Sequence, residues 1–174
     1  MASVARYCCC GGCPALEMTI TGIDAAACCW TNGYDAFNLD TPLGIDGTYS
    51  VVGVPTLVGG VCTYQFFSGV SGILRYRIAD PGDCTGIIQS GCSHTFGATV
   101  KYDTATAKVT EVIIDSSSSC TLALLENLRL FTATGLSTSL GVAISNQETV
   151  CTASMSSPFF KALTPGGSIT ISTA

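Results

Sequence analysis

The sequence predicts an all-β domain, a sandwich or barrel-like arrangement of about ten short antiparallel strands with a cysteine-rich N-terminal segment. Three observations favour this class. Segments rich in β-branched and aromatic residues recur along the chain, turns containing Gly or Pro separate them, and helical patterns do not alternate with strand patterns. The 174 residues suit a single domain with its own core. We divide it into a cysteine-rich clamp, 1–30, and a β body, 31–174.

The expected strands begin after the cysteine-rich head. Residues 16–23 alternate apolar and polar side chains, which is typical of a half-buried strand. Asn32-Gly33 predicts a tight turn, because both residues tolerate positive φ. The turn-rich stretch 35–47 is expected to be a long loop. Further strands, each bounded by Gly or Pro, are expected at 48–52, 61–67 and 73–78.

The second half of the chain continues this pattern, with one ambiguous stretch. A weak strand at 87–92 is expected before strands at 95–102 and 108–114, and the last two predict a hairpin across 103–107. The Ser-rich residues 116–119 are expected to be an exposed loop tip. Residues 121–131 fit a helical turn and a strand about equally, so both interpretations stay open. Short strands at 140–145, 149–153 and 168–173 are expected to close the chain.

The composition argues against several classes of function. Charged residues make up 11% of the chain, against about 25% in a typical globular protein. The net charge is −5 with only seven basic residues, so nucleic acid is not an expected partner. No apolar run approaches the roughly 20 residues of a membrane span. A mean hydropathy of +0.47 with so few charges indicates a surface covered by Ser and Thr or by neighbouring subunits, and we expect a homo-oligomer.

Eleven cysteines are the most distinctive feature of the sequence. We interpret them first as disulfides, in which the head cysteines are pinned to the pair at 28–29 and the others bridge strands and loops. Adjacent cysteines should have different partners, and an odd total leaves at least one thiol free, metal-bound or bonded to another chain. The candidates are Cys8, Cys9, Cys10, Cys13, Cys28 and Cys29 in the head, and Cys62, Cys84, Cys92, Cys120 and Cys151 in the body.

Two other uses of the thiols stay open. The spacing Cys10-Gly11-Gly12-Cys13 is that of half a structural zinc site, which Cys28 and Cys29 would complete, although an adjacent pair does not converge on an ion as C-x-x-C does. A redox dithiol would place C-x-x-C at the start of a helix, where this sequence predicts a strand. No other cofactor is expected.

No set of residues predicts catalysis. His94 is the single histidine of the chain, and neither Ser93 nor Cys92 beside it forms a recognisable nucleophile–base motif. The Gly-rich stretches lack the lysine of a phosphate-binding loop. We therefore predict a chain that is not an enzyme.

Aromatic residues give the alternative hypothesis of a carbohydrate- or surface-binding β-sandwich module. A stacking platform for a glycan would use Trp30, Tyr34, Tyr64 and Tyr76, and its partner would be a host-surface glycan. The competing interpretation places these aromatic side chains in the core.

The head of type Cys-Cys-x-x-Cys-Pro, the strand ending in Gly22-Ile23, the Cys28-Cys29 pair and the segments 47–49 and 61–64 resemble cysteine-rich all-β proteins of tailed bacteriophages and prophages. The resemblance covers residues 7–80. It implies a virion component such as a tail, fibre or capsid-decorating subunit, with other virion subunits as partners and no catalytic residues. Residues 1–7 lack the apolar run of a secretory signal. We therefore expect synthesis in the host cytoplasm and a working life in an extracellular particle.

Overall fold

The computed structural model describes residues 12–23, 29–32, 35–39, 44–78, 90–118, 127–147, 152–153 and 167–174. Within them the chain forms β-strands and no helix, which confirms the predicted all-β class. In the same part of the chain, no helix is long and apolar enough to cross a membrane. The strands are β1 (Leu16–Thr21), β2 (Cys29–Asn32), β3 (Asp35–Leu39), β4 (Gly47–Ser50), β5 (Thr56–Val58), β6 (Val61–Ile78), β7 (Ser90–Asp103), β8 (Lys108–Ser118), β9 (Asn127–Thr138), β10 (Ala143–Ser145), β11 (Thr152–Ala153) and β12 (Ser168–Thr173).

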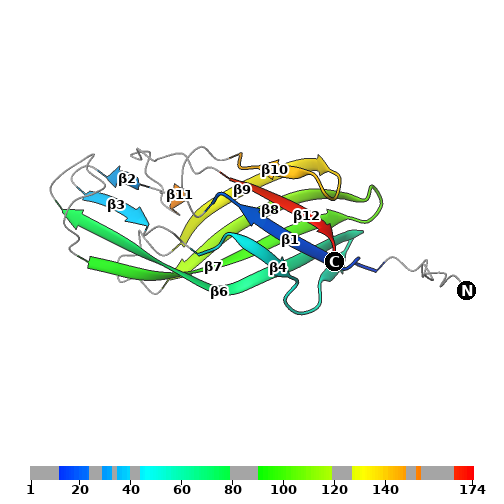
Figure 1. Ribbon diagram of the computed structural model, residues 1–174, viewed down its shortest axis with the longest axis horizontal. Coiled ribbons are helices and arrows are strands. Elements are labelled where there is room, and N and C mark those ends of the chain that lie inside the picture. Colours follow the sequence, from blue (N-terminus) through cyan, green and yellow to red (C-terminus); the bar gives the residue numbers. More distant parts are fainter. Residues whose placement is uncertain are drawn as a thin grey trace, which may run out of the picture.

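The strands form two antiparallel sheets. The small sheet has four strands in the order β10-β12-β1-β4, so the first and last strands of the chain are neighbours. The large sheet has eight strands in the order β11-β9-β8-β7-β6-β3-β2, with β5 added beside β6. The small sheet lies over one part of the long strands β6 to β9, which continue beyond it (Figure 1).

The hydrophobic core lies between the two sheets. In β1 the buried positions alternate with half-exposed ones, so that Leu16, Met18 and Ile20 point inward, as expected for a strand with one buried face. The large sheet contributes the biggest side chains of the same cluster, including Tyr64, Phe66, Phe96 and Phe131. Burying an aliphatic or aromatic side chain of this size contributes about 1.5 to 3 kcal/mol.

Backbone hydrogen bonds join the small sheet to the large one on both sides. After β4 the chain crosses over, and the Val52 N–H donates to the Gln65 carbonyl of β6 at 2.7 Å. After β10 it crosses in the same way, and the Gln147 N–H donates to the Thr132 carbonyl of β9 at 2.7 Å. Both outer strands of the small sheet therefore continue into segments that hydrogen-bond to the large sheet.

Two strands of the large sheet are longer than predicted. The predicted strands at 61–67 and 73–78 are one strand, β6, and the predicted segments at 87–92 and 95–102 merge in β7 over its described range. Gly residues were expected to end these strands. Instead, shifts of register between Gln65 and Val70 absorb the irregularity, as β-bulges do, and pairing with β7 continues on both sides.

The predicted loop at 35–47 is wrong over its first part. Residues 35–39 form β3, which pairs with β2 on one side and with the far end of β6 on the other. The pairing partner is about 40 residues away in the sequence, and local turn propensity carries no information about it. Asn32 and Asp35 are paired across residues 33 and 34, which lie outside the described residues.

The serine run was also predicted wrongly. Ser116 to Ser118 continue β8 instead of forming an exposed tip, and Ser116 is buried. The described end of the ambiguous stretch, 127–131, belongs to strand β9 and not to a helix. The predicted hairpin at 103–107 is confirmed. In its turn the Asp103 carboxylate accepts hydrogen bonds from the N–H groups of Ala105 and Thr106, and these bonds lower its pKa.

Candidate functional site

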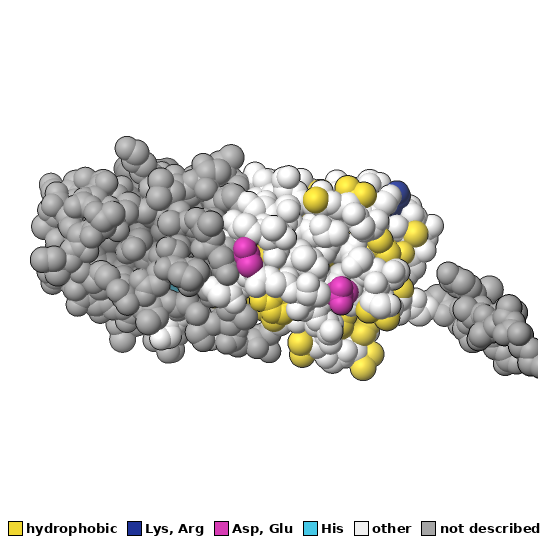
Figure 2. Space-filling view, in the orientation of Figure 1, with side chains coloured by type: hydrophobic (Ala, Val, Ile, Leu, Met, Phe, Trp, Pro, Cys, Tyr) yellow, Lys and Arg dark blue, Asp and Glu magenta, His cyan; other side chains and the backbone are white. Residues whose placement is uncertain are grey.

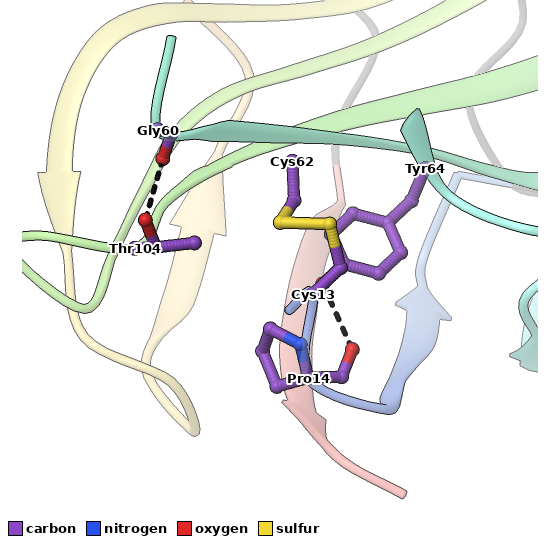
Figure 3. The surroundings of a disulfide bond; sticks show 6 residues. All are labelled: Cys13, Pro14, Gly60, Cys62, Tyr64 and Thr104. Atoms are coloured by element: carbon purple, nitrogen blue, oxygen red, sulfur yellow. Dashed lines mark hydrogen bonds between the residues drawn. A yellow bond between two sulfur atoms is a disulfide. The ribbon is translucent and has the colours of Figure 1, made fainter. Parts of the chain in front are cut away.

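A disulfide joins the start of the small sheet to the large sheet. Cys13 lies just before β1, and its sulfur is bonded to that of Cys62, a fully buried residue of β6 that is 49 positions away. Figure 3 shows the bond beside the Tyr64 side chain, whose hydroxyl points toward the Pro14 carbonyl. The bond therefore fixes the start of the small sheet next to the first part of β6.

Tyr64 supports the same junction by a hydrogen bond. Its hydroxyl donates to the Pro14 carbonyl at 2.8 Å, and its ring is fully buried in the core. Burial, with a smaller contribution from Tyr102, raises the pKa of Tyr64 to about 12. The disulfide, this hydrogen bond and the Val52–Gln65 backbone bond together form what we call the disulfide seam.

Beside this seam, four hydrophobic side chains are exposed on the β4–β6 connection. Val54 is 90% exposed and Val58 76%, with Val52 and Leu57 about half exposed. We call these four residues the apolar tip. Figure 2 shows hydrophobic side chains gathered along the rim of the described body where Figure 1 places this connection, with few charged groups near them.

The apolar tip is held by a tight hairpin. β5 pairs with the start of β6 so that Leu57 lies opposite the disulfide-bonded Cys62. The turn residues Gly59 and Gly60 have φ values of 57° and 81°, as a two-residue hairpin of the I′ kind requires. This strand was not predicted, although Gly59-Gly60 between two β-prone segments was the available signal.

A shallow cavity of about 390 Å³ lies at the base of the tip. Its lining is mostly apolar and includes Pro14, Leu16, Val51 and Pro55, together with the disulfide-bonded Cys13. The one titratable side chain in the lining is Tyr64, whose hydroxyl is already hydrogen-bonded to Pro14. The cavity therefore suits an apolar group from a partner better than it suits catalysis.

The observed disulfide corrects the predicted pairing of the head. Cys13 is bonded to Cys62 and not to Cys28 or Cys29, because packing of the two sheets brings β6 next to the segment before β1. A thiol in a disulfide is no metal ligand, so the zinc set of Cys10, Cys13, Cys28 and Cys29 loses one member. In the described part of the chain, no group of three or more metal-ligating side chains occurs.

The other cysteines are placed only in part. Cys29 lies in β2 and Cys92 in β7, at positions where the backbone alone is described. Outside the described residues lie Cys8, Cys9, Cys10, Cys28, Cys84, Cys120 and Cys151.

The structure places only part of the predicted aromatic platform. Tyr64 is fully buried, so it offers no ring face to a glycan. Trp30, Phe37 and Tyr76 occupy directly opposite positions on β2, β3 and β6, and cross-strand neighbours share one face of a sheet. Tyr34 lies outside the described residues.

His94 is a buried residue of β7. Its Nδ1 lies 3.0 Å from the Ser116 Oγ, and its ring stacks on Phe96 at 6.5 Å. Burial lowers the pKa of His94. Among the described residues no polar group is bonded to its Nε2.

Comparison with known proteins gives no assignment. No family model, curated protein or solved structure matches this chain.

Proposed function

We propose that this chain is a non-enzymatic structural subunit of an extracellular assembly, a bacteriophage virion component such as a tail, fibre or capsid-decorating protein. Subunits of this kind need a rigid body, a surface for neighbouring subunits and resistance to conditions outside the cell. In this proposal the sandwich core is the rigid body and the apolar tip is the surface for neighbouring subunits. The disulfide seam gives the resistance to conditions outside the cell.

The apolar tip is the observation that carries the proposal. Large exposed apolar groups on a free monomer favour aggregation, whereas the same groups at a subunit contact stabilise assembly. Here Val58 lies in the β5–β6 hairpin and Val54 just before it, and the hairpin pairs with the disulfide-bonded Cys62 of β6. A fixed apolar surface loses little conformational entropy on binding, which favours association.

The disulfide supports an extracellular location. Disulfides persist in oxidising surroundings and are rare in reducing cytosol. The bond between Cys13 and Cys62 closes a long stretch of chain and ties the head to the body. Such a crosslink stabilises the folded state of a protein that must stay folded for long periods outside the cell.

Native mass tests the assembly. The oxidised full chain is compared with the Val54→Ser/Val58→Ser double variant by size-exclusion chromatography with light scattering. We expect a multimer for the unchanged chain and a shift to monomer for the variant. Val142→Ser is the matched control, because Val142 is 51% exposed but lies outside the tip. A monomer at all concentrations, or a multimer that the double variant leaves intact, would overturn the proposal.

Mass spectrometry of purified particles tests the virion role itself. The chain should be found in particles released from a host that carries its coding sequence, at a copy number in proportion to other structural proteins. Its absence from such particles would remove the virion assignment while leaving the assembly result unaffected.

One observation favours a second candidate, a carbohydrate-binding module. Trp30, Phe37 and Tyr76 are aligned in register across β2, β3 and β6. Aromatic rows of this kind suit stacking on sugar rings. Glycan-array binding that is lost in Trp30→Ala with the fold retained would support this candidate, and no binding to any glycan would end it.

A further inference from the structure

The outer edge of β9 carries an unusual form of protection. An edge strand presents backbone N–H and C=O groups that can pair with a strand of another chain. At the start of β9, β11 covers this edge by antiparallel pairing at Leu128 and Arg129. Beyond it, at 130–134, no strand pairs with the outer edge in the described part of the chain. The edge is therefore paired with a strand at 128–129, whereas the backbone groups at 130–134 require other hydrogen-bond partners.

Two consecutive amide residues provide that cover. The Asn146 side chain accepts a hydrogen bond from the Thr132 N–H at 3.0 Å and donates to the Leu130 carbonyl at 3.1 Å. The Gln147 side chain accepts from the Thr134 N–H at 2.8 Å and donates to the Thr134 carbonyl at 3.2 Å. The Gln147 backbone N–H donates to the Thr132 carbonyl at 2.7 Å. These bonds occupy the alternate backbone positions that a neighbouring strand would use.

Charged residues and proline, two common edge defences, are missing from this stretch. Proteins commonly protect edges with Lys, Pro or a bulge. No charged residue and no Pro occurs between Arg129 and Glu148. The register of β9 against β8 shifts at Leu130 and again after Thr134, where Gly135 has a φ of 65°, so irregularities flank residues 131–134 but do not interrupt them. The sequence Leu130-Phe131-Thr132-Ala133-Thr134 is uncharged and β-prone, the composition that favours strand-to-strand association.

We propose that Asn146 and Gln147 form an amide guard that keeps the β9 edge from pairing with a second copy of this chain. The partner is a second copy because the strand is uncharged and can pair antiparallel with itself about Thr132. The edge exposed by removal of the guard is a latent strand-addition site, distinct from the apolar tip. This inference does not depend on the proposed function.

The double variant Asn146→Ala/Gln147→Ala tests the guard. Hydrogen exchange should become at least tenfold faster at the Thr132 and Thr134 amides, since both lose their acceptors. Sedimentation velocity should show concentration-dependent species larger than those of the unchanged chain. Gln147→Ala alone, which removes two of the side-chain bonds, should accelerate exchange at Thr134 only and gives a milder variant if the double variant folds poorly.

Two further variants decide the cause. Gln65→Ala removes an exposed amide that hydrogen-bonds to the Thr99 side chain and covers no edge, so it should leave the size unchanged. Adding Thr134→Lys to the double variant places a charge at an exposed position of the edge, and it should reverse self-association while exchange stays fast. The proposal is overturned if exchange is unchanged, if faster exchange brings no larger species, or if the lysine does not reverse the association.

Discussion

On one side of the sandwich a disulfide joins the small sheet to β6, whereas on the other side the links to β9 among the described residues are hydrogen bonds. The disulfide seam combines the Cys13–Cys62 bond with the hydrogen bond from Tyr64 to Pro14. The amide seam consists of the bonds that Asn146 and Gln147 make to β9. The first depends on oxidation and the second does not.

The two seams also lie next to different kinds of surface. The disulfide seam lies beside four exposed hydrophobic residues, and the amide seam covers the backbone of an uncharged edge strand. A strong crosslink next to an apolar surface favours durable association there. Polar groups that occupy an edge disfavour association at the other side. Under the two proposals above, the molecule would have one side that binds partners and one side that is protected from them.

The largest expected effect comes from breaking the covalent seam. Cys13→Ser/Cys62→Ser should lower the free energy of unfolding by about 3 to 4 kcal/mol, because the bond closes a loop of 49 residues in the unfolded chain. Guanidinium unfolding with and without a reducing agent measures it. The reductant should no longer affect stability through this pair in the variant. A loss below 1 kcal/mol would make this seam weaker than the value expected for the amide seam and would contradict the ranking.

An intermediate effect is expected from the amide seam. Asn146→Ala removes the partners of the Thr132 N–H and the Leu130 carbonyl. At about 1 kcal/mol for each neutral hydrogen bond, the loss should be about 2 kcal/mol in chemical unfolding. Reductant should not change this difference. If the loss exceeds that of the double cysteine variant, the amide seam is the stronger one and the comparison is reversed.

The smallest effect at neutral pH is expected from Tyr64→Phe, which removes one hydrogen bond of the disulfide seam and should cost about 1 kcal/mol. The same variant also shows how the stability of the disulfide seam depends on pH above 10. An unfolded tyrosine ionises near pH 10, but folded Tyr64 holds its proton to about 12. The unfolded state therefore loses its proton first, and the stability that Tyr64 contributes falls as pH rises from 10 to 12.

Brief unfolding measurements at pH 9 and at successive values up to 11.5 test this pH dependence. Stability of the unchanged chain should fall more steeply than that of Tyr64→Phe, and the two curves should meet and then cross within this range, because a pKa shift from 10 to about 12 outweighs the ~1 kcal/mol of the hydrogen bond. Parallel curves would mean that Tyr64 does not titrate in this way. The amide seam contains no ionisable side chain of its own, so Asn146→Ala should run parallel to the unchanged chain.

The sequence was a good guide to local structure. Alternation at 16–23 predicted a half-buried strand, and 168–173 was predicted as a short strand, and the structure forms a strand in both places. The turn at 103–107 was predictable because Asp103 bonds to N–H groups two and three residues ahead. These features depend on neighbouring residues, whose chemistry can be read directly.

Features that depend on distant partners were not predictable. The pairing of Cys13 with Cys62 follows from the packing of two sheets, and β3 follows from the far end of β6. Asn146 and Gln147 look like ordinary turn residues until β9 lies beside them. The hairpin of the apolar tip differs from these features. It was not predicted either, but Gly59-Gly60 between two β-prone segments was a local signal that could have predicted it.

Hydrogen exchange over a dilution series of the oxidised full chain tests most directly whether the apolar tip is the assembly surface. Exchange at 52–58 should slow as protein concentration rises through the multimer range, while exchange at 143–147 should not change. Protection that rises with concentration at 130–147 instead, or no dependence on concentration at the tip, would contradict the assignment of the two sides.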